Sequence, residues 1–283
     1  MQTTVYLHPE RTIIAHWSTY DQAPVLDSYI ELQPQDDIRS NLLPDAQCTV
    51  SVHASATRWH HFPIDPDEDV ILRRGFELAT CMPDVDPDID LVSVVNDKLE
   101  SNGRIWCGMC IVPRHISDDI VRRIGPEVRI VPDVVSDIHA ARMTITPQQH
   151  TWALVGLRGE RWVCALISPE HVITQCVAFP RDATQSFVEG ALESFYGIRS
   201  TTHDAVDHVL FYGDALTKTT YDELASELAE QSVRIGRLQP FRRVAAAVDD
   251  SVKRSLLAVA HILSPIVAPV LPQFEEIESG ANP

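Results

Sequence analysis

The sequence is poor in basic residues. It has 23 Lys and Arg against 40 Asp and Glu, a net charge of −17, and no block of basic residues offsets this balance. Nucleic acid binding needs a positive surface, so nucleic acid is excluded as an expected partner. The acidic runs DPDEDV (65–70) and DVDPDIDL (84–91) are interpreted as solvated loops and helix caps. The histidines show no metal-ligand spacing such as HExxH, and no metal ligand is predicted.

The sequence also lacks a secretory signal and an uninterrupted apolar span. Its first ten residues, MQTTVYLHPE, have neither a basic region nor an apolar core, so we expect a chain of the reducing cytoplasm. The most apolar stretch, 255–272, is interrupted by Pro265, Pro269 and Pro272. Proline removes backbone hydrogen bonds that lipid cannot replace. We therefore predict no membrane insertion, but a buried helix to about Ser264 followed by an extended apolar tail.

Cysteines are few and scattered, at positions 48, 81, 107, 110, 164 and 176, so no disulfide framework is expected. Trp-Cys-Gly-Met-Cys (106–110) resembles the redox tetrad of thioredoxins, which requires a helix after the second cysteine. Here Ile-Val-Pro follows, and the pattern favours a hairpin: strand 90–97, turn 98–103 and strand 104–112. Residues three apart on a strand face opposite ways, so neither a disulfide nor a shared metal is expected from Cys107 and Cys110.

Hydrophobic periodicity predicts a pattern that restarts near residue 150. The first part reads as strands and helices at 3–17 (a hairpin), 24–32, 36–43 (helix), 48–53, 56–65 (irregular or extended), 67–82 (helix), the hairpin 90–112, 117–125 (helix, Ser117 as N-cap and Gly125 as C-cap), 127–131 and 133–143 (helix). The second reads as three strands in 150–179, helix 181–197, strand 205–216, helix 217–231, strand 232–236 and one or two helices in 240–263.

Each part thus opens with a three-strand antiparallel meander, which indicates a duplicated, mixed α/β architecture. We predict a first domain over 1–147, with a small inserted subdomain around 66–115. A second domain, shorter and ending in a helix and tail, is predicted over 148–283.

This layout resembles the actin-like ATPase superfamily, whose two halves each have a ribonuclease-H-like core. More narrowly it is similar to the PilM proteins of type IV pilus assembly and the cytoplasmic domain of GspL proteins of type II secretion. The residues that carry the likeness are WCGMCIVPRHISDDIVRRIGPEVRIVPDVVSDIHAAR (106–142) and HVLFYGDALTKTTYDELASELAEQSVRIGRLQPF (208–241). The resemblance implies an actin-like fold of two such halves, with a peripheral part of the second half trimmed.

Superfamily members that bind Mg·ATP hold it with an acidic, glycine-rich turn in each opening hairpin and a glycine run near the adenosine. Here the first turn, LHPER (7–11), has neither Asp nor Gly. The second, VGLRGE (155–160), keeps Gly156 and Gly159 but has Val155 where Asp is expected. The adenosine loop keeps only Gly213, followed by Asp214. Any nucleotide would therefore use Gly156, Gly159, Gly213 and Asp214, but we expect a degenerate, pseudo-ATPase site without catalytic residues, cofactor or metal.

The resemblance implies a non-catalytic scaffold of an inner-membrane platform, either of a type IV pilus or of type II secretion. Such a protein is cytoplasmic, is held at the membrane by a protein partner, and binds the N-terminal cytoplasmic tail of a bitopic membrane protein. Whether the chain forms a homodimer is left open by the sequence. The rival is an active ATPase or phosphotransferase, with Glu10, Glu160 and Asp214 as metal ligands. A ribonuclease-H-like nuclease is disfavoured because the core strands carry Val, Ile, Leu and Cys instead of carboxylates.

Overall fold

The computed structural model describes residues 1–65, 67–86, 89–94, 100–101, 104–145, 150–169 and 173–271. These residues form two compact units, each made of separate stretches of sequence. Unit 1 contains 1–58, 111–144 and 239–271, and unit 2 contains 59–110 and 145–238. Among the described residues, no helix combines the length and the apolar character needed to cross a membrane.

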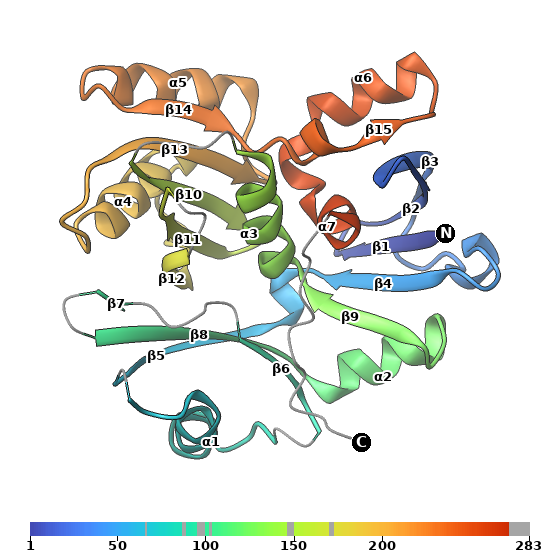
Figure 1. Cartoon of the computed structure of the whole chain (residues 1–283), viewed down its shortest axis with the longest axis horizontal. Helices are drawn as coiled ribbons and strands as arrows, with labels where there is room; N and C mark the ends of the chain where they lie inside the picture. The colour runs from blue at the N-terminus through green and yellow to red at the C-terminus, as the bar shows by residue number, and fades with distance from the viewer. Residues whose placement is uncertain are drawn as a thin grey trace. The chain divides into compact units, whose positions relative to one another are not determined.

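Unit 1 is built on a six-stranded mixed sheet of order β15-β3-β2-β1-β4-β9 (Figure 1). Its strands are β1 (Gln2–His8), β2 (Arg11–Tyr20), β3 (Ala23–Leu32), β4 (Gln47–Val52), β9 (Val128–Pro132) and β15 (Ala245–Ala246). β1 to β3 form the antiparallel meander, while β4 adds to β1, and β9 to β4, in parallel. Parallel strands need crossover connections: β2, β3 and the segment with η1 connect β1 to β4, and residues 59–110 of unit 2 together with α2 connect β4 to β9.

The helical elements of unit 1 include a buried pair, α3 (Asp133–Thr144) and α7 (Ser264–Val267), which pack on each other. The others are η1 (Arg39–Asn41), η2 (Ala54–Ala56), α2 (Arg114–Arg123), η3 (Pro240–Arg243), α6 (Asp250–Ala258), η4 (Ala260–Ile262) and η5 (Ala268–Val270). Hydroxyls of the sheet bind the carbonyls of α7: Thr4 Oγ1 donates to Ile266 O and Ser51 Oγ to Pro265 O, both at 2.7 Å. These bonds satisfy buried polar groups and tie α7 to β1 and β4.

Unit 2 repeats the topology with a sheet of order β12-β11-β10-β13-β14. The strands are β10 (Thr151–Arg158), β11 (Arg161–Ile167), β12 (Ile173–Pro180), β13 (Val206–Gly213) and β14 (Arg234–Arg237). Helices α4 (Phe187–Arg199) and α5 (Lys218–Ala229) contribute Phe195 and Leu224 to a core that includes Trp162 and Phe211. The repeated order, three antiparallel strands followed by two parallel ones, confirms the predicted duplication.

A second, smaller sheet in unit 2 has the order β5-β8-β6, with β7 paired to β8. Its strands are β5 (Arg58–Ile64), β6 (Leu91–Val94), β7 (Glu100–Ser101) and β8 (Arg104–Val112), accompanied by helix α1 (Val70–Cys81). The WCGMC stretch therefore lies in strand β8, as predicted. Cys110 is buried and not in a disulfide, whereas the Cys107 side chain lies outside the described residues.

Several predicted helices begin or end at other residues than the structure shows. α2 begins at Arg114 after an extended Pro113, so Ser117 lies inside the helix and is not its N-cap. Gly125 does follow the end of this helix, with φ 147°. The predicted helix 36–43 is reduced to the single turn η1. The first predicted helix of the second half begins only at Phe187, where Ser186 and Glu189 form a capping box.

The apolar segment after Ser264 is not extended, contrary to the prediction. It forms the short helices α7 and η5, in each of which a proline, Pro265 or Pro269, occupies one of the first two positions. The missing N–H of proline costs nothing there, because the first N–H groups of a helix have no partner within the helix. Pro272 and the residues after it lie outside the described part of the chain. The two units are defined by contacts between residues, whereas the predicted domain boundary at 147/148 was defined by the repeat in the sequence. That boundary therefore stays a prediction.

Candidate functional site

The residues predicted for nucleotide contact gather in unit 2 where β10 and β13 end. The two strands run in parallel, with Gly156 beside Tyr212 and Leu157 beside Gly213. Gly159 lies in the turn between β10 and β11 and has φ 57°. Asp214 directly follows β13. The sequence therefore identified residues that do share one edge of the sheet.

Gly156 is in contact with a side chain of the protein itself. A Cβ atom at this position would lie 2.2 Å from the nearest ring atom of Tyr212, so any larger residue would displace the ring. The Tyr212 side chain is completely buried. Gly156 is thus explained by the close approach of an aromatic ring.

Gly213 is required by the backbone. Its φ is 109°, in the region that favours glycine, and a Cβ atom there would lie 2.0 Å from the carbonyl oxygen of Leu157. The N–H of Asp214 also donates to this oxygen, at 3.3 Å. Gly213 therefore allows the end of β13 to pass close to β10.

Asp214 takes part in an ion pair. Arg158 Nη1 donates to Asp214 Oδ1 at 3.2 Å, with the arginine fully buried and the aspartate side chain 30% exposed. The guanidinium carbon also lies 5.5 Å from the centroid of the Tyr212 ring, within the range of a cation–π contact. The charge of Asp214 is thus already balanced within unit 2, while the rival metal ligands Glu10 and Glu160 are exposed turn residues.

Backbone N–H groups after β13 are used internally. Asp214 donates to Leu157 O, Leu216 to Gly213 O and Thr217 to Ala215 O. Helix α5 then begins with a capping box in which Thr217 and Thr220 satisfy each other's backbone N–H groups. Anion sites at helix N-termini depend on N–H groups that are available to the ligand. This loop therefore offers little to a phosphate group.

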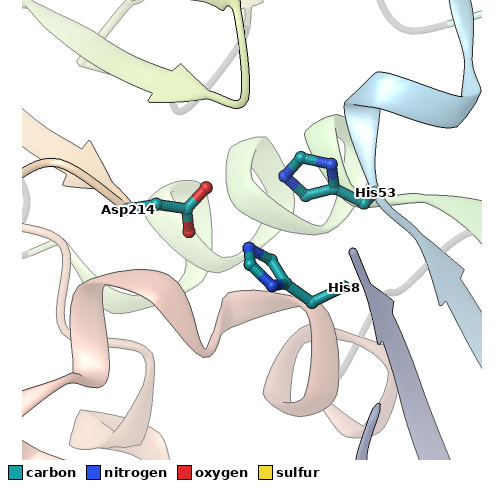
Figure 2. A group of neighbouring side chains, drawn as sticks. All are labelled: His8, His53 and Asp214. Carbon is teal, nitrogen blue, oxygen red and sulfur yellow. The ribbon is translucent and has the colours of Figure 1, made fainter. Parts of the chain in front are cut away.

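The corresponding hairpin of unit 1 has His8 and no Asp at its turn. Figure 2 shows His8, at the end of β1, beside His53, the residue after β4. Their ring centroids lie 4.9 Å apart at 77°, and the Tyr6 ring lies 5.8 Å from that of His8. The Glu10 N–H bonds to His8 Nδ1 at 3.2 Å, which closes the turn. The turn thus carries an aromatic cluster in place of the Asp that the family resemblance calls for.

A buried carboxylate also contacts this end of unit 1. Asp133, the first residue of α3, is fully buried. Its Oδ2 accepts from Tyr6 Oη and from the N–H of Ala54, each at 3.1 Å. It joins β1, α3 and the turn after β4, which is a structural role.

Sequence reasoning missed a different cluster, in the small-sheet part of unit 2. His60 of β5 and Glu77 and Cys81 of α1 bring one ligand atom each to within 4.8 Å of one another. The histidine is 17 positions from the glutamate, so no short motif marks it. The only sequence signal is the spacing of Glu77 and Cys81, one turn apart on a helix that was predicted correctly.

The topology described above defines the class: the chain has the actin-like ATPase fold. A chain of the PilM–PilN type IV pilus biogenesis complex is similar, with a TM-score of 0.59 and 10% identity over 100% of this chain and 99% of that one. So is a Bacteroides thetaiotaomicron protein with actin-like ATPase fold and unknown function (TM-score 0.54, 9% identity, 83% and 90% covered). The cytoplasmic domain of EpsL from the type II secretion system of Vibrio cholerae matches with a TM-score of 0.45, at 15% identity over 81% and 94%.

No family model matches the sequence, and a comparison with curated proteins found no match either. The identities to the solved structures are low, so the structural likeness establishes the fold alone. It is the fold that was predicted from the two halves of the sequence.

Proposed function

We propose that this chain is a non-catalytic scaffold that binds the cytoplasmic tail of a bitopic inner-membrane protein in a type IV pilus or type II secretion platform. The full-length likeness to a chain of the PilM–PilN complex supports the partner class. The non-catalytic part of the proposal rests on the loop after β13. The N–H groups of Asp214, Leu216 and Thr217 in this loop already have acceptors within the protein.

Two further contacts in unit 2 support the absence of hydrolysis. The Tyr212 ring covers Gly156, and Arg158 pairs with Asp214 and so balances its charge. A Mg²⁺ ion bound through phosphates needs carboxylate or water ligands that are not committed elsewhere. Gly156, Gly159, Gly213 and Asp214 therefore act, in this proposal, as structural residues of the hairpin and its neighbouring loop.

The charge of the chain favours the same class of partner. Cytoplasmic segments next to a membrane span are enriched in Lys and Arg, and this chain carries a net charge of −17. An acidic protein gains nothing from an anionic lipid surface, so a basic protein tail is the more favourable membrane contact. The proposal thus places the chain at the membrane through its partner.

Calorimetry with Mg·ATP tests the non-catalytic part, with Mg·ADP as control. We expect no heat and no thermal stabilisation at millimolar nucleotide. Micromolar binding followed by phosphate release would overturn it and would make Gly156, Gly159, Gly213 and Asp214 the first residues to mutate.

The partner part is tested separately with synthetic peptides of cytoplasmic N-terminal tails from bitopic membrane proteins encoded beside this chain. We expect one tail to bind with micromolar affinity, while a scrambled peptide of the same composition does not. Failure of every such tail, with nucleotide binding also absent, would reject the scaffold role and leave the fold assignment intact.

A further inference from the structure

Three side chains with different metal-binding chemistry meet between β5 and α1. His60 Nε2 lies 3.2 Å from Glu77 Oε2, and Cys81 Sγ lies 3.5 Å from the same oxygen. Glu77 is only 7% exposed, His60 is partly buried and Cys81 faces solvent. The cluster lies entirely in unit 2 and is separate from the hairpin described above.

We propose that His60, Glu77 and Cys81 form a binding site for Zn²⁺. Imidazole nitrogen, carboxylate oxygen and thiolate sulfur are the three ligand types that zinc takes in proteins. With ordinary zinc–ligand bonds, a tetrahedral site separates its nitrogen and oxygen ligands by about 3.4 Å and its oxygen and sulfur ligands by about 3.6 Å. The distances of 3.2 and 3.5 Å are close to these values, and the third pair, His60 Nε2 and Cys81 Sγ, lies within 4.8 Å.

The local structure fixes the ligands in place. Glu77 and Cys81 are separated by one helical turn on α1, so both side chains leave the same face of the helix. Arg73, one turn earlier, donates through Nη2 to Glu77 Oε1 at 2.6 Å. This contact occupies the oxygen that does not face His60 and Cys81, and it orients Oε2 toward them. Outer contacts of this kind commonly position metal ligands.

Without metal, hydrogen bonds to the Glu77 carboxylate connect the three side chains. Burial alone would raise the pKa of Glu77, but hydrogen bonds from His60, Cys81 and Arg73 outweigh it and leave the pKa lowered. Desolvation, and then the hydrogen bond to Glu77 and its charge, raise the pKa of the Cys81 thiol. Zinc binding would replace the thiol proton and release it to solvent, so affinity should rise with pH in the neutral range. Three protein ligands leave a fourth position for water.

Cobalt titration of the full chain, chelator-treated and kept reduced, tests the site. Co²⁺ is the probe because a cobalt–thiolate bond gives a near-ultraviolet charge-transfer band. We expect this band to saturate at one Co²⁺ per chain and to be lost on addition of one Zn²⁺. The conservative Cys81→Ser variant should lose the band, and His60→Ala and Glu77→Gln should weaken binding by tenfold or more.

The matched control is His61→Ala. His61 follows His60 on β5, so its side chain leaves the opposite face of the strand, and it is exposed. This variant should titrate like the unaltered chain. Arg73→Gln should keep the band but bind about tenfold more weakly, as expected for a residue that positions a ligand.

Two results would overturn the proposal: no thiolate band in the unaltered chain, or a band that persists in Cys81→Ser. Circular dichroism of each variant separates loss of the site from loss of fold. A second readout is hydrogen exchange of α1, which Zn²⁺ should slow in the unaltered chain and leave unchanged in Cys81→Ser.

Discussion

At the scale of single residues, glycines of the predicted nucleotide site have structural reasons to be glycine. Gly156 faces the Tyr212 ring, and Gly213 passes the carbonyl of Leu157 with a positive φ. Sequence reasoning could detect both glycines but not what faced them, because the ring and the carbonyl belong to a strand or residue far away in sequence. A glycine in a turn is equally compatible with a phosphate and with a protein neighbour.

The interpretation of Gly156 predicts a specific coupling. Gly156→Ala should destabilise the chain by about 2 kcal/mol, because overpacking a buried contact typically costs that much. In a Tyr212→Ala background, which is itself destabilised, the same change should cost almost nothing. Urea unfolding of the four chains measures the coupling. An equal cost in both backgrounds would show that the ring is not what requires glycine at this position.

The cysteines should differ sharply in reactivity. Complete burial raises the pKa of the Cys164 thiol to about 12 and raises the pKa of Cys176 as well. The pKa of Cys81 is also raised, but its thiol is exposed and a reagent can reach it. The thiolate is the reactive form of cysteine, so buried thiols that stay protonated are inert. Alkylation of the native chain followed by mass spectrometry should modify Cys81 well before Cys164 or Cys176. Simultaneous modification would indicate that the sheet of unit 2 opens readily.

At the scale of elements, the strands were predicted better than the helix ends. The meanders were clear because apolar residues run along β1, β2, β10 and β11 between short turns. The start of α2 was misplaced because Ser117 is a common N-cap residue, while the extended Pro113 ends the preceding strand and starts the helix without a side-chain cap. The short helices after Ser264 depend on the burial of α7 against β1, which is a tertiary contact and leaves no local signal.

The start of α5 gives a prediction for an element boundary. Thr217→Ala should cost about 1 kcal/mol, because it removes the side-chain acceptor of the Thr220 N–H. Thr219→Ala, on the exposed surface of the same helix, is the matched control and should change stability by less than about 0.5 kcal/mol. Thermal unfolding of both variants provides the comparison. If the two changes cost the same, the capping box contributes nothing to stability.

The stability that the contact between α1 and β5 contributes should depend on pH. The pKa of Glu77 is lowered in the folded chain from its ordinary value of 4.5, so its contribution to stability is fully present above that pH. It is lost as pH falls through the lower pKa of the folded state. Glu77→Gln should therefore be less stable than the unaltered chain at pH 7, and the difference should shrink toward pH 3. Unfolding midpoints over this range test it, and a constant difference would contradict the assigned pKa shift.

At the scale of the whole molecule, charge was the most informative property of the sequence, although it says nothing about fold. The net charge of −17 argues against nucleic acid as a partner and favours a basic one. If the scaffold proposal holds, attraction over several ångströms should speed the encounter with a basic tail, and salt should screen it. The association rate of the bound tail should then fall steeply between low and high salt, while the dissociation rate changes little.

Stopped-flow fluorescence with a labelled tail peptide measures both rates. The matched peptide has its Lys residues replaced by Gln, which removes charge while keeping most of the length and polarity; it should associate more slowly at low salt and show little salt dependence. Because the sequence pI is about 5.0, lowering the pH toward that value should also slow association of the basic peptide. An association rate indifferent to salt and pH would mean that apolar contacts alone select the tail, and that the acidity of the chain serves only to keep it apart from other molecules.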